Sequence, residues 1–569
     1  MCAVNDSVLK GYAMMNSHAN RRPRFPHALS AAALFAALCT LLVLLPGPAV
    51  SAEDDADYIV LLSDQARQET ALLAEEGTFF GPAGEEALPP FAVVDGALLR
   101  ELLRDGAVVW YEEDCAVTLE EPAGDTVLLA EDGPWHLSVI HADQTVAAGY
   151  TGLNIKVGVI DSGCRAHSEL GERLLPGWNY LTDTADTLDN IGHGTAVASL
   201  IAGETTGAAP GAYIVPLKCF DQSTTTVSYI CQALYGAVDT FGCDIINMSL
   251  GISVNSQSLR AAVNYVTDSG AVLVCAAGNG GTATVYYPAG YDSAVGIGAL
   301  DRNGSVYSRS NHNRSLFLTA PGVDVYSANY LGGYKVRTGT SFATPLVSGA
   351  AAVLLRIDPT LTAGALFDYL AMTAQDRGSE GWDEYYGWGV MDMSAAAEAV
   401  YDHAYRTILF DANGGSGAPE TQAVRNNTAL RLPAETPVRD GYAFAGWELT
   451  RDGTQETYDP QSEFTVDADL TMRALWTSVT DLRLTDISLE NGTVAVRLNH
   501  PAWNGCRIGI ALYGEGNRML RCCLAPPSGE LALESLKRND VHYVKAFLLE
   551  DSMGLPLCEC LELELTAAS

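Results

Sequence analysis

The sequence is short of positive charge. It has 33 Lys and Arg against 69 Asp and Glu, which gives a net charge of −36 over 569 residues. A nucleic-acid-binding protein presents a basic surface, so this balance argues against that class and against adhesion to an anionic membrane. The deficit is uneven, because residues 53–134 hold three basic and 21 acidic residues, a net charge of −18. Half of the net negative charge lies in this one segment.

Two further absences concern metal-binding motifs. No two cysteines have the CxxC spacing of a zinc site. No contiguous run of oxygen ligands marks a calcium loop. What is abundant is apolar content, since 48% of the residues are hydrophobic and only 18% are charged. That composition excludes a wholly disordered chain, and the length predicts about four domains at roughly 150 residues each.

Long apolar runs are also scarce, and the clearest one lies near the start. Ala31–Leu45 follows three arginines, ends at a Pro-Gly-Pro sequence and precedes the small residues Val50-Ser51-Ala52. This pattern is typical of a secretory signal peptide, so we expect residues 1–52 to be removed and the protein to be secreted. The alternative is an uncleaved anchor helix, but the run falls short of the roughly 20 residues that span a bilayer. No transmembrane segment is expected after signal removal.

The cysteines leave two interpretations open. Thirteen are present, of which two leave with the signal, one is Cys115, and the rest form two groups of five: Cys164, Cys219, Cys231, Cys243, Cys275; and Cys506, Cys522, Cys523, Cys558, Cys560. An extracellular protein could oxidise them, but two odd groups pair incompletely unless bridges cross domains. Buried free thiols are the interpretation we favour for most of them.

Apolar periodicity divides the mature chain into four parts. Residues 53–134 predict a small α+β segment, with strands at 58–62 and 107–111 and a helix at 97–104, followed by a connector. Residues 135–403 alternate short buried runs with helical segments, which predicts an α/β domain with a parallel sheet flanked by helices. Residues 407–477 and 478–569 predict two small β-rich domains, the second a β-sandwich.

Four polar positions of the α/β region lie where buried strands end or helices begin. Asp161 ends the strand Lys156–Ile160, and His193 opens a helix between two glycines. Asn279 follows a second buried strand, and Ser341 opens a long apolar helix. A serine hydroxyl needs a base to become a nucleophile, and an imidazole held by a buried carboxylate is well suited to that role. An asparagine amide can stabilise the oxyanion that forms. Each motif alone is weak evidence, but the four together favour acyl transfer.

Several motifs resemble those of the subtilisin-like serine proteases, the subtilases. The resemblance covers about residues 135–400, and its most specific motif is Gly-Thr-Ser-x-Ala-Thr-Pro at 339–345. It implies that Asp161 orients the base, His193 is the general base and acid, Ser341 is the nucleophile and Asn279 donates to the oxyanion. It also implies the activity, hydrolysis of protein or peptide substrates.

The same resemblance implies where a substrate binds. Ser249, Leu250 and Gly251 match the edge segment to which an extended peptide adds as a strand, and Ala276, Ala277 and Gly278 contribute to the pocket beside it. No cofactor is expected. Family members often hold structural calcium, but no site for it is assignable in this sequence.

The segment at 53–134 occupies the place where secreted subtilases carry an inhibitory propeptide. The resemblance implies that it assists folding, binds the enzyme as a partner and is cut off by the enzyme itself, so that the protein is made as a zymogen. The alternative is a permanent acidic domain that favours solubility.

Residues 407–477 resemble the small β-rich repeat of internalin-type bacterial surface proteins. The likeness rests on three motifs: Phe410–Gly415, Gly441–Trp447 and Asp469–Trp476. It implies a cell-surface component as a partner of residues 407–569. Two functions therefore stay open: a secreted serine endopeptidase with accessory modules, which the intact chemical positions favour, or a surface-binding protein whose subtilase-like domain is catalytically silent.

Overall fold

A computed structural model describes residues 56–69, 78–82, 88–119, 133–451, 454–478, 483–490, 493–498, 506–525, 530–532, 541–550 and 559–564. The expected signal peptide at 1–52 lies outside these residues, as does most of the connector before residue 133. The chain forms two compact units, one of residues 1–139, 154–352 and 376–390, the other of residues 140–153, 353–375 and 391–569.

The first unit begins with a four-stranded antiparallel sheet in the order β2-β3-β1-β4. Its elements are β1 (Asp57–Leu62), α3 (Asp64–Glu69), β2 (Thr78–Phe80), β3 (Phe91–Asp95), α4 (Gly96–Arg104) and β4 (Val108–Glu113). Asp95 caps α4 by accepting a hydrogen bond from the Leu98 N–H. The predicted strands and helix of this α+β segment are present. One face of the sheet packs in a cluster that also contains residues of the α/β region.

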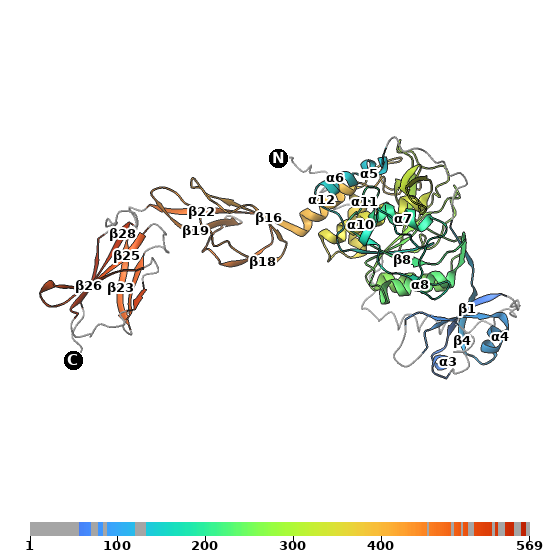
Figure 1. Ribbon diagram of the computed structural model, residues 1–569, viewed down its shortest axis with the longest axis horizontal. Helices are drawn as coiled ribbons and strands as arrows, with labels where there is room; N and C mark the ends of the chain where they lie inside the picture. Colours follow the sequence, from blue (N-terminus) through green and yellow to red (C-terminus); the bar gives the residue numbers. More distant parts are fainter. Residues whose placement is uncertain are drawn as a thin grey trace. The chain divides into compact units, whose positions relative to one another are not determined.

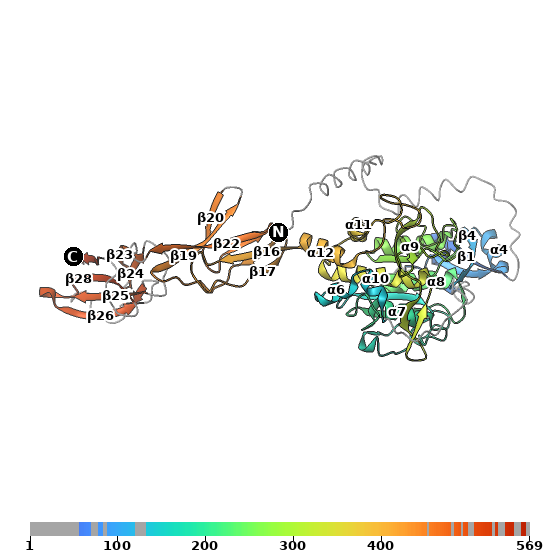
Figure 2. The ribbon, with the colours of Figure 1, turned by 90° about the horizontal axis from the view of Figure 1, so that it is seen from above.

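A seven-stranded parallel sheet forms the centre of the first unit, in the order β13-β12-β11-β10-β6-β8-β7. The strands are β6 (Lys156–Asp161), β7 (Trp178–Asn179), β8 (Tyr213–Lys218), β10 (Ile245–Met248), β11 (Val272–Ala276), β12 (Val295–Leu300) and β13 (Leu316–Pro321). Because parallel strands end at the same edge, this sheet gathers the polar residues that follow β6, β10 and β11. The α/β prediction is confirmed, and Figures 1 and 2 show the sheet among its helices.

Four helices of ten residues or more follow the strands of this sheet: α7 (His193–Ala202), α8 (Val227–Asp239), α9 (Gln257–Asp268) and α10 (Thr340–Ile357). The helices α8 and α9 pack against the strand residues that point to one face, such as Ile246 and Leu273. By length and composition α10 could cross a membrane, but 94% of it is buried in the protein, as in the core helix of a globular domain. Its Pro345 lies inside the helix, beyond the first turn, so the backbone hydrogen bond to the Ser341 carbonyl oxygen is missing. That oxygen accepts from the Ser249 hydroxyl instead.

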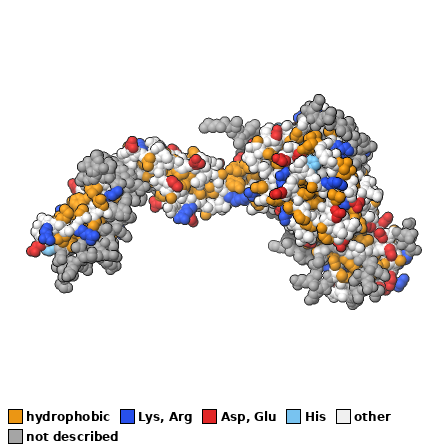
Figure 3. Space-filling model, viewed as in Figure 1, with side chains coloured by type: hydrophobic (Ala, Val, Ile, Leu, Met, Phe, Trp, Pro, Cys, Tyr) orange, Lys and Arg blue, Asp and Glu red, His pale blue; other side chains and the backbone are white. Residues whose placement is uncertain are grey.

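Shorter elements complete this region. They are α5 (Trp135–Val139), the 3₁₀ turn η2 (Gly171–Arg173), the hairpin of β14 (Val325–Ala328) and β15 (Tyr334–Arg337), and the antiparallel pair of β5 (Ala116–Thr118) with β9 (Thr224–Thr226). On the face of the molecule in Figure 3, acidic and basic side chains are interspersed over the α/β region.

The second unit contains three helices and the β-rich tail. The helices are α6 (Ala142–Ala147), α11 (Ala363–Thr373) and α12 (Met393–Ala404), and the strands of the repeat region are β16 (Tyr405–Asp411), β17 (Gln422–Arg425), β18 (Thr428–Arg431), β19 (Tyr442–Arg451), β20 (Thr454–Tyr458), β21 (Glu463–Val466) and β22 (Leu470–Ser478). A five-stranded sheet β17-β16-β22-β19-β20 and the pair β18-β21 enclose a core around Trp447 and Phe410. These two rings pack edge to face, with their centroids 5.1 Å apart.

The last region has two further sheets, β23-β24-β27 and β26-β25-β28-β29. Their strands are β23 (Leu484–Glu490), β24 (Thr493–Leu498), β25 (Cys506–Tyr513), β26 (Met519–Ala525), β27 (Glu530–Ala532), β28 (Tyr543–Glu550) and β29 (Leu561–Glu564), with the 3₁₀ turn η4 (Glu515–Asn517). Residues of both sheets, among them Val494 and Ile510, share one apolar cluster, as in a sandwich. The strands β23 and β24 pair antiparallel as a hairpin, and the Asn491-Gly492 sequence between them lies outside the described residues.

The described thiols are free. They are Cys115, Cys164, Cys219, Cys231, Cys243, Cys275, Cys522, Cys523 and Cys560. Five of them are buried in the α/β region, as the favoured interpretation predicted. Cys560 lies directly before β29, which begins at Leu561. Cys558 lies outside the described residues.

Candidate active site

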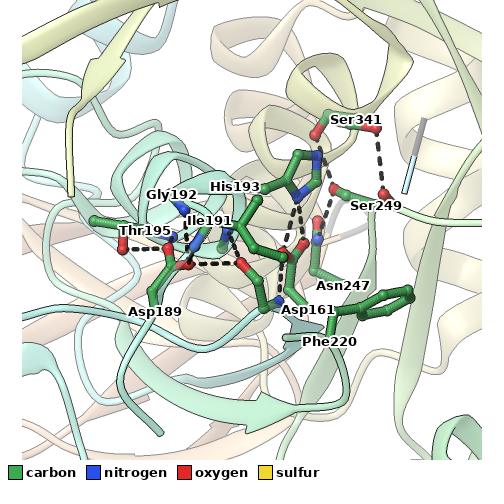
Figure 4. Close-up of polar contacts among 12 residues, drawn as sticks. Asp161, Asp189, Ile191, Gly192, His193, Thr195, Phe220, Asn247, Ser249 and Ser341 are labelled. Atoms are coloured by element: carbon green, nitrogen blue, oxygen red, sulfur yellow. Dashed lines mark hydrogen bonds and ion pairs between the residues drawn. The ribbon is translucent and has the colours of Figure 1, made fainter. Parts of the chain in front are cut away.

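The candidate base and its orienting carboxylate meet at the carboxyl edge of the sheet. Asp161 ends β6, His193 begins α7, and both side chains are fully buried. The Nδ1 atom of His193 lies 2.8 Å from each carboxylate oxygen of Asp161. A carboxylate on Nδ1 holds the proton of a neutral imidazole there, which leaves Nε2 as the basic nitrogen. Figure 4 shows the ring between Asp161 and Ser341.

The glycines on either side of His193 are required by close backbone contacts. Gly192 has φ +91°, and a Cβ atom on it would lie 2.3 Å from the ring of Tyr330. A Cβ atom on Gly194 would lie 2.1 Å from the carbonyl oxygen of Gly163, which follows Asp161 in the chain. No side chain fits at either position, so the Gly-His-Gly motif brings the helix start close to the end of β6.

The candidate nucleophile lies in the first turn of α10. Its hydroxyl donates to the backbone carbonyl oxygen of Ser249 at 3.2 Å, and the Ser249 hydroxyl donates to the carbonyl oxygen of Ser341 at 2.8 Å. The amide of Asn247 donates to the Ser249 hydroxyl at 3.0 Å and accepts from Ser348 at 2.9 Å. These bonds connect the end of β10 to the start of α10, so the substrate edge and the nucleophile keep a fixed relation.

Asn279 reaches the same place from the end of β11. Its side-chain oxygen accepts hydrogen bonds from the backbone N–H of Thr340 at 2.8 Å and from the Thr340 hydroxyl at 3.1 Å. This fixes the orientation of the amide, because the oxygen faces Thr340 and the NH₂ group faces the other way. A Cβ atom on Gly339 would lie 3.3 Å from that nitrogen. The donor side of Asn279 is therefore next to the turn that carries Ser341.

The six predicted substrate-binding residues also converge here. Ser249, Leu250 and Gly251 follow β10, while Ala276, Ala277 and Gly278 end β11 and continue beyond it. The N–H of Gly278 lies 3.3 Å from the Thr340 hydroxyl. Gly251 forms an antiparallel bridge with Thr118 of the N-terminal segment. An extended stretch of the chain thus lies on the edge where a peptide was predicted to add.

The sequence interpretation missed a second buried carboxylate, Asp189. One of its oxygens accepts from the N–H groups of Ile191 and Gly192, at 3.0 and 2.7 Å, and from the Ser162 hydroxyl at 2.9 Å. The other accepts from the N–H and the hydroxyl of Thr195, at 2.9 and 2.6 Å. Asp189 therefore holds the turn that presents His193 (Figure 4). An acidic residue four positions before the histidine, at a helix start, was the available signal.

Two thiols near the site behave as core residues. Cys164 and Cys275 are buried, and burial raises the pKa of each thiol well above its ordinary value. A thiol that stays protonated is a poor nucleophile and a poor metal ligand. Their position is thus that of small hydrophobic residues, in line with the interpretation favoured from the sequence.

No donor set for a metal is present in the part of the chain that the structure describes. Among those residues, no three His, Cys, Asp or Glu side chains lie close enough to hold an ion. One buried carboxylate, Glu169, accepts from the hydroxyls of Thr205 and Tyr334, both at 2.6 Å, and from neighbouring N–H groups. Both of its oxygens therefore already have hydrogen-bond donors from the protein itself.

A buried carboxylate, an imidazole and a serine that meet at the carboxyl edge of a parallel sheet are the groups of a serine hydrolase. Comparison with known proteins makes the class specific. Residues 152–389 match the model of the subtilase family. The chain is 39% identical over 280 residues to subtilisin DY of Bacillus licheniformis, covering 47% of this chain and 100% of that protein. The chain belongs to the subtilase family, and it is a serine protease of the subtilisin type.

Other relatives extend the likeness. Subtilisin E of Bacillus subtilis is 36% identical over 319 residues, covering 54% of this chain and 80% of that protein. The minor extracellular protease Epr of the same organism is 32% identical over 416 residues, covering 69% of this chain and 62% of that protein. Residues 407–475 match the Listeria-Bacteroides repeat domain, which agrees with the predicted surface repeat.

Proposed function

We propose that the chain is a secreted serine endopeptidase that works through Asp161, His193 and Ser341 and is made as a self-processed zymogen. The observation that carries the proposal is the buried pair of Asp161 and His193, whose ring lies beside Ser341. Each residue comes from a different element, namely β6, α7 and α10, so the fold and not local sequence brings them together.

The reaction follows from the order of these groups. The Ser341 hydroxyl adds to the carbonyl carbon of the substrate while Nε2 of His193 takes its proton. The resulting imidazolium is stabilised by the Asp161 carboxylate on Nδ1. The proton then passes to the leaving amine, the C–N bond breaks, and an acyl-enzyme remains on Ser341. Water, activated in the same way, hydrolyses the ester and restores the serine.

The tetrahedral intermediate carries a negative oxygen that needs hydrogen-bond donors already in place. Asn279 would supply its NH₂ group, since its oxygen is turned toward Thr340. The backbone N–H of Ser341, at the start of α10, would be the second donor, with the helix dipole favouring negative charge there. Both donors are fixed before the substrate binds, so little reorganisation accompanies the chemistry.

The zymogen proposal rests on how the N-terminal segment contacts the enzyme. Glu112 accepts hydrogen bonds from the N–H groups of Gln257 and Ser258 at the start of α9, at 2.8 and 2.9 Å. Asp114 accepts from the N–H and the hydroxyl of Ser228 at the start of α8, at 2.9 and 2.6 Å. Two acidic side chains thus cap two helices of the enzyme, and the strand that follows them covers Gly251. A segment held there blocks the substrate edge until it is cut.

Secretion is supported by the predicted signal at residues 1–52 and by a relative that is named an extracellular protease. The Listeria-Bacteroides repeat at 407–475 favours a second role for the tail, retention at a cell surface. That role accompanies hydrolysis and does not replace it, because the chemical positions of the α/β region are intact.

Self-processing gives the first test. The wild type and Ser341→Ala should be expressed side by side and followed by denaturing electrophoresis. We expect the wild type to lose the N-terminal segment and to hydrolyse an unfolded protein, and Ser341→Ala to remain uncut and inactive. Loss of the segment from Ser341→Ala at the wild-type rate would contradict self-processing, and an inactive but processed wild type would contradict the peptidase.

A further inference from the structure

A buried arginine connects the turn before the proposed base to the strand before the proposed nucleophile. Arg337 ends β15, is 3% exposed, and donates from Nη2 to the carbonyl oxygen of Gly192 at 3.0 Å. Gly192 directly precedes His193, and Arg337 lies four residues before Ser341. This one hydrogen bond therefore joins the two segments whose relative position sets the distance between base and nucleophile.

Gly192 is held at both of its backbone polar groups. Its N–H donates to the carboxylate of Asp189 at 2.7 Å (Figure 4), and its carbonyl oxygen accepts from the guanidinium of Arg337. Hydrogen bonds with one ionised partner are about twice as strong as those between neutral groups. A glycine backbone is otherwise the most flexible in a chain, so an anion on one side and a cation on the other hold this turn in one conformation.

The chain between Arg337 and Ser341 is fixed as well. Arg337 itself pairs with Val325 in the hairpin of β14 and β15. The three residues that follow it each form a hydrogen bond to another segment: Thr338 with the N–H of Asp324, Gly339 with the carbonyl oxygen of Gly322, and Thr340 with the side chain of Asn279. A displacement of Arg337 would therefore be passed on to Ser341 and not absorbed by a loose loop.

The guanidinium of Arg337 also lies over the aromatic ring that packs against the base. Its Cζ atom is 5.9 Å from the centroid of the Phe342 ring, and the centroids of the Phe342 and His193 rings are 5.3 Å apart. A planar guanidinium can stack on an aromatic ring while its donors stay in a fixed fork, which a lysine ammonium cannot do. Arg337 thus contacts both the backbone before His193 and the ring beside it.

We propose that Arg337 is a positioning residue for acyl transfer, which deepens the proposed function and rests on it. Through Gly192 and Phe342 it sets the place of the His193 ring relative to the Ser341 hydroxyl. A misplacement of about 1 Å in such an arrangement can cost about 10²-fold in rate. Loss of Arg337 slows the step in which Nε2 of His193 takes the serine proton, and it leaves substrate binding unchanged because Arg337 itself is buried.

Steady-state hydrolysis of a peptide amide, whose acylation step limits the rate, tests this role. Arg337→Met keeps the length of the side chain but has neither charge nor donor, so we expect kcat to fall by about 10- to 100-fold and KM to stay within about twofold. Arg337→Lys keeps a charge and donors but not the planar fork, and its kcat should lie between these two. Lys335→Met removes a cation from the same strand and is the matched control, with the kcat of the wild type.

Counting active sites separates positioning from a loss of folded protein. The rates are expressed per serine that reacts with a fluorophosphonate when the reaction is complete, so unfolded molecules do not lower kcat. Variants that process themselves slowly are matured by a tagged wild-type enzyme, which is then removed. Urea unfolding of Ser341→Ala with and without Arg337→Met shows whether the substituted chain folds.

The outcomes distinguish this inference from the proposed function. A folded Arg337→Met with the kcat of the wild type would overturn the role of Arg337, and so would an impairment that lies wholly in KM. If Arg337→Met does not fold, Arg337→Lys decides in the same way. A wild type that neither labels nor cuts any peptide contradicts the proposed peptidase itself.

Discussion

Asp189 and Asn279 illustrate how much of this site depends on single polar atoms. Asp189 holds the turn before His193 through five hydrogen bonds, and Asn279 is turned by Thr340 so that its NH₂ group faces the nucleophile turn. Neither apolar periodicity nor burial, taken alone, would identify either residue as part of the site. Their function at this scale is to fix orientation, and orientation to within about 1 Å is what acyl transfer requires.

Substitutions at Asn279 separate its two roles. Asn279→Ala should lower kcat by about 10²–10³-fold with little change in KM, the cost known for the loss of an oxyanion donor in subtilisin. Asn279→Asp keeps an acceptor for the Thr340 N–H but removes the NH₂ donor. Its kcat should therefore fall at least as far as that of Asn279→Ala. The measurement is steady-state hydrolysis of a peptide. Near-normal kcat in Asn279→Asp would show that the residue only supports Thr340.

His136 should make the fold sensitive to acid. It is fully buried, its Nε2 donates to the Thr206 carbonyl oxygen at 2.9 Å, and burial lowers its pKa to about 4. The unfolded chain, with a pKa near 6.5, takes up the proton first, so this contribution to stability is complete above about pH 6.5 and is lost as the pH falls toward 4. The loss amounts to about 3 kcal/mol.

Urea unfolding of Ser341→Ala between pH 4 and 7.5 measures this loss without self-digestion. In a double variant that adds His136→Asn, the free energy of unfolding should decrease less between pH 6.5 and 4. The partly exposed His167 provides the control, because adding His167→Asn should leave this decrease unchanged. The same decrease in the free energy of unfolding for all three proteins would contradict the assignment to His136.

At the residue level the sequence singles out the four proposed chemical positions because each lies in a short motif with steric demands. The glycines beside His193 and the Thr-Ser-x-Ala-Thr-Pro run leave few other interpretations. Asp189 was not found because an acidic residue in a loop is ordinarily solvated, and only its burial shows otherwise. Spacing identifies groups that act on substrate more readily than groups that orient them.

At the level of elements, apolar periodicity indicates the α/β alternation but does not mark every strand of the sheet. The strand β12, with the sequence Val-Gly-Ile-Gly-Ala-Leu, is hard to find in this way because its glycines interrupt the apolar pattern. Those glycines allow close packing: a Cβ atom on Gly296 would lie 2.9 Å from the Ser315 carbonyl oxygen, and one on Gly298 would lie 3.0 Å from Thr319. Tight contact between neighbouring strands is a tertiary requirement that periodicity does not reveal.

The helix caps supplied by the N-terminal segment can be tested as elements. Glu112→Ala removes the acceptor for the two N–H groups at the start of α9 and should slow self-processing by about 2- to 30-fold, as expected for the loss of a cap worth about 0.5–2 kcal/mol. The neighbouring Glu113 is exposed, so Glu113→Ala is the matched control. Pulse-chase electrophoresis measures the rate. Equal rates for both variants would contradict capping as the hold on this segment.

At the scale of the whole molecule, the net charge of −36 describes parts that we propose do not stay together. The N-terminal segment is the most acidic part, and its acidic side chains include the two that cap enzyme helices. Its charge therefore has a specific use in docking, beyond any effect on solubility. The tail adds two β-rich regions with cores of their own, which fits an accessory role.

Removal of residues 407–569 should separate the two roles of the mature protein. We expect peptide hydrolysis by the processed protein to remain within about twofold of the full chain, because every proposed chemical group lies in the other compact unit. Retention on cells of the producing organism should fall. A shortened protein that folds but loses hydrolysis, or that stays bound to cells as before, would contradict this division.

The most direct test of the central claim is labelling with a fluorophosphonate, which reacts only with a serine that a neighbouring base activates. The account predicts one adduct per mature chain, located on Ser341 by peptide mass spectrometry, and none in Ser341→Ala or His193→Ala. It also predicts that the uncut chain labels far more slowly than the mature one, since the N-terminal strand covers the substrate edge. A processed wild type that does not label, or an adduct on another serine, would contradict the account.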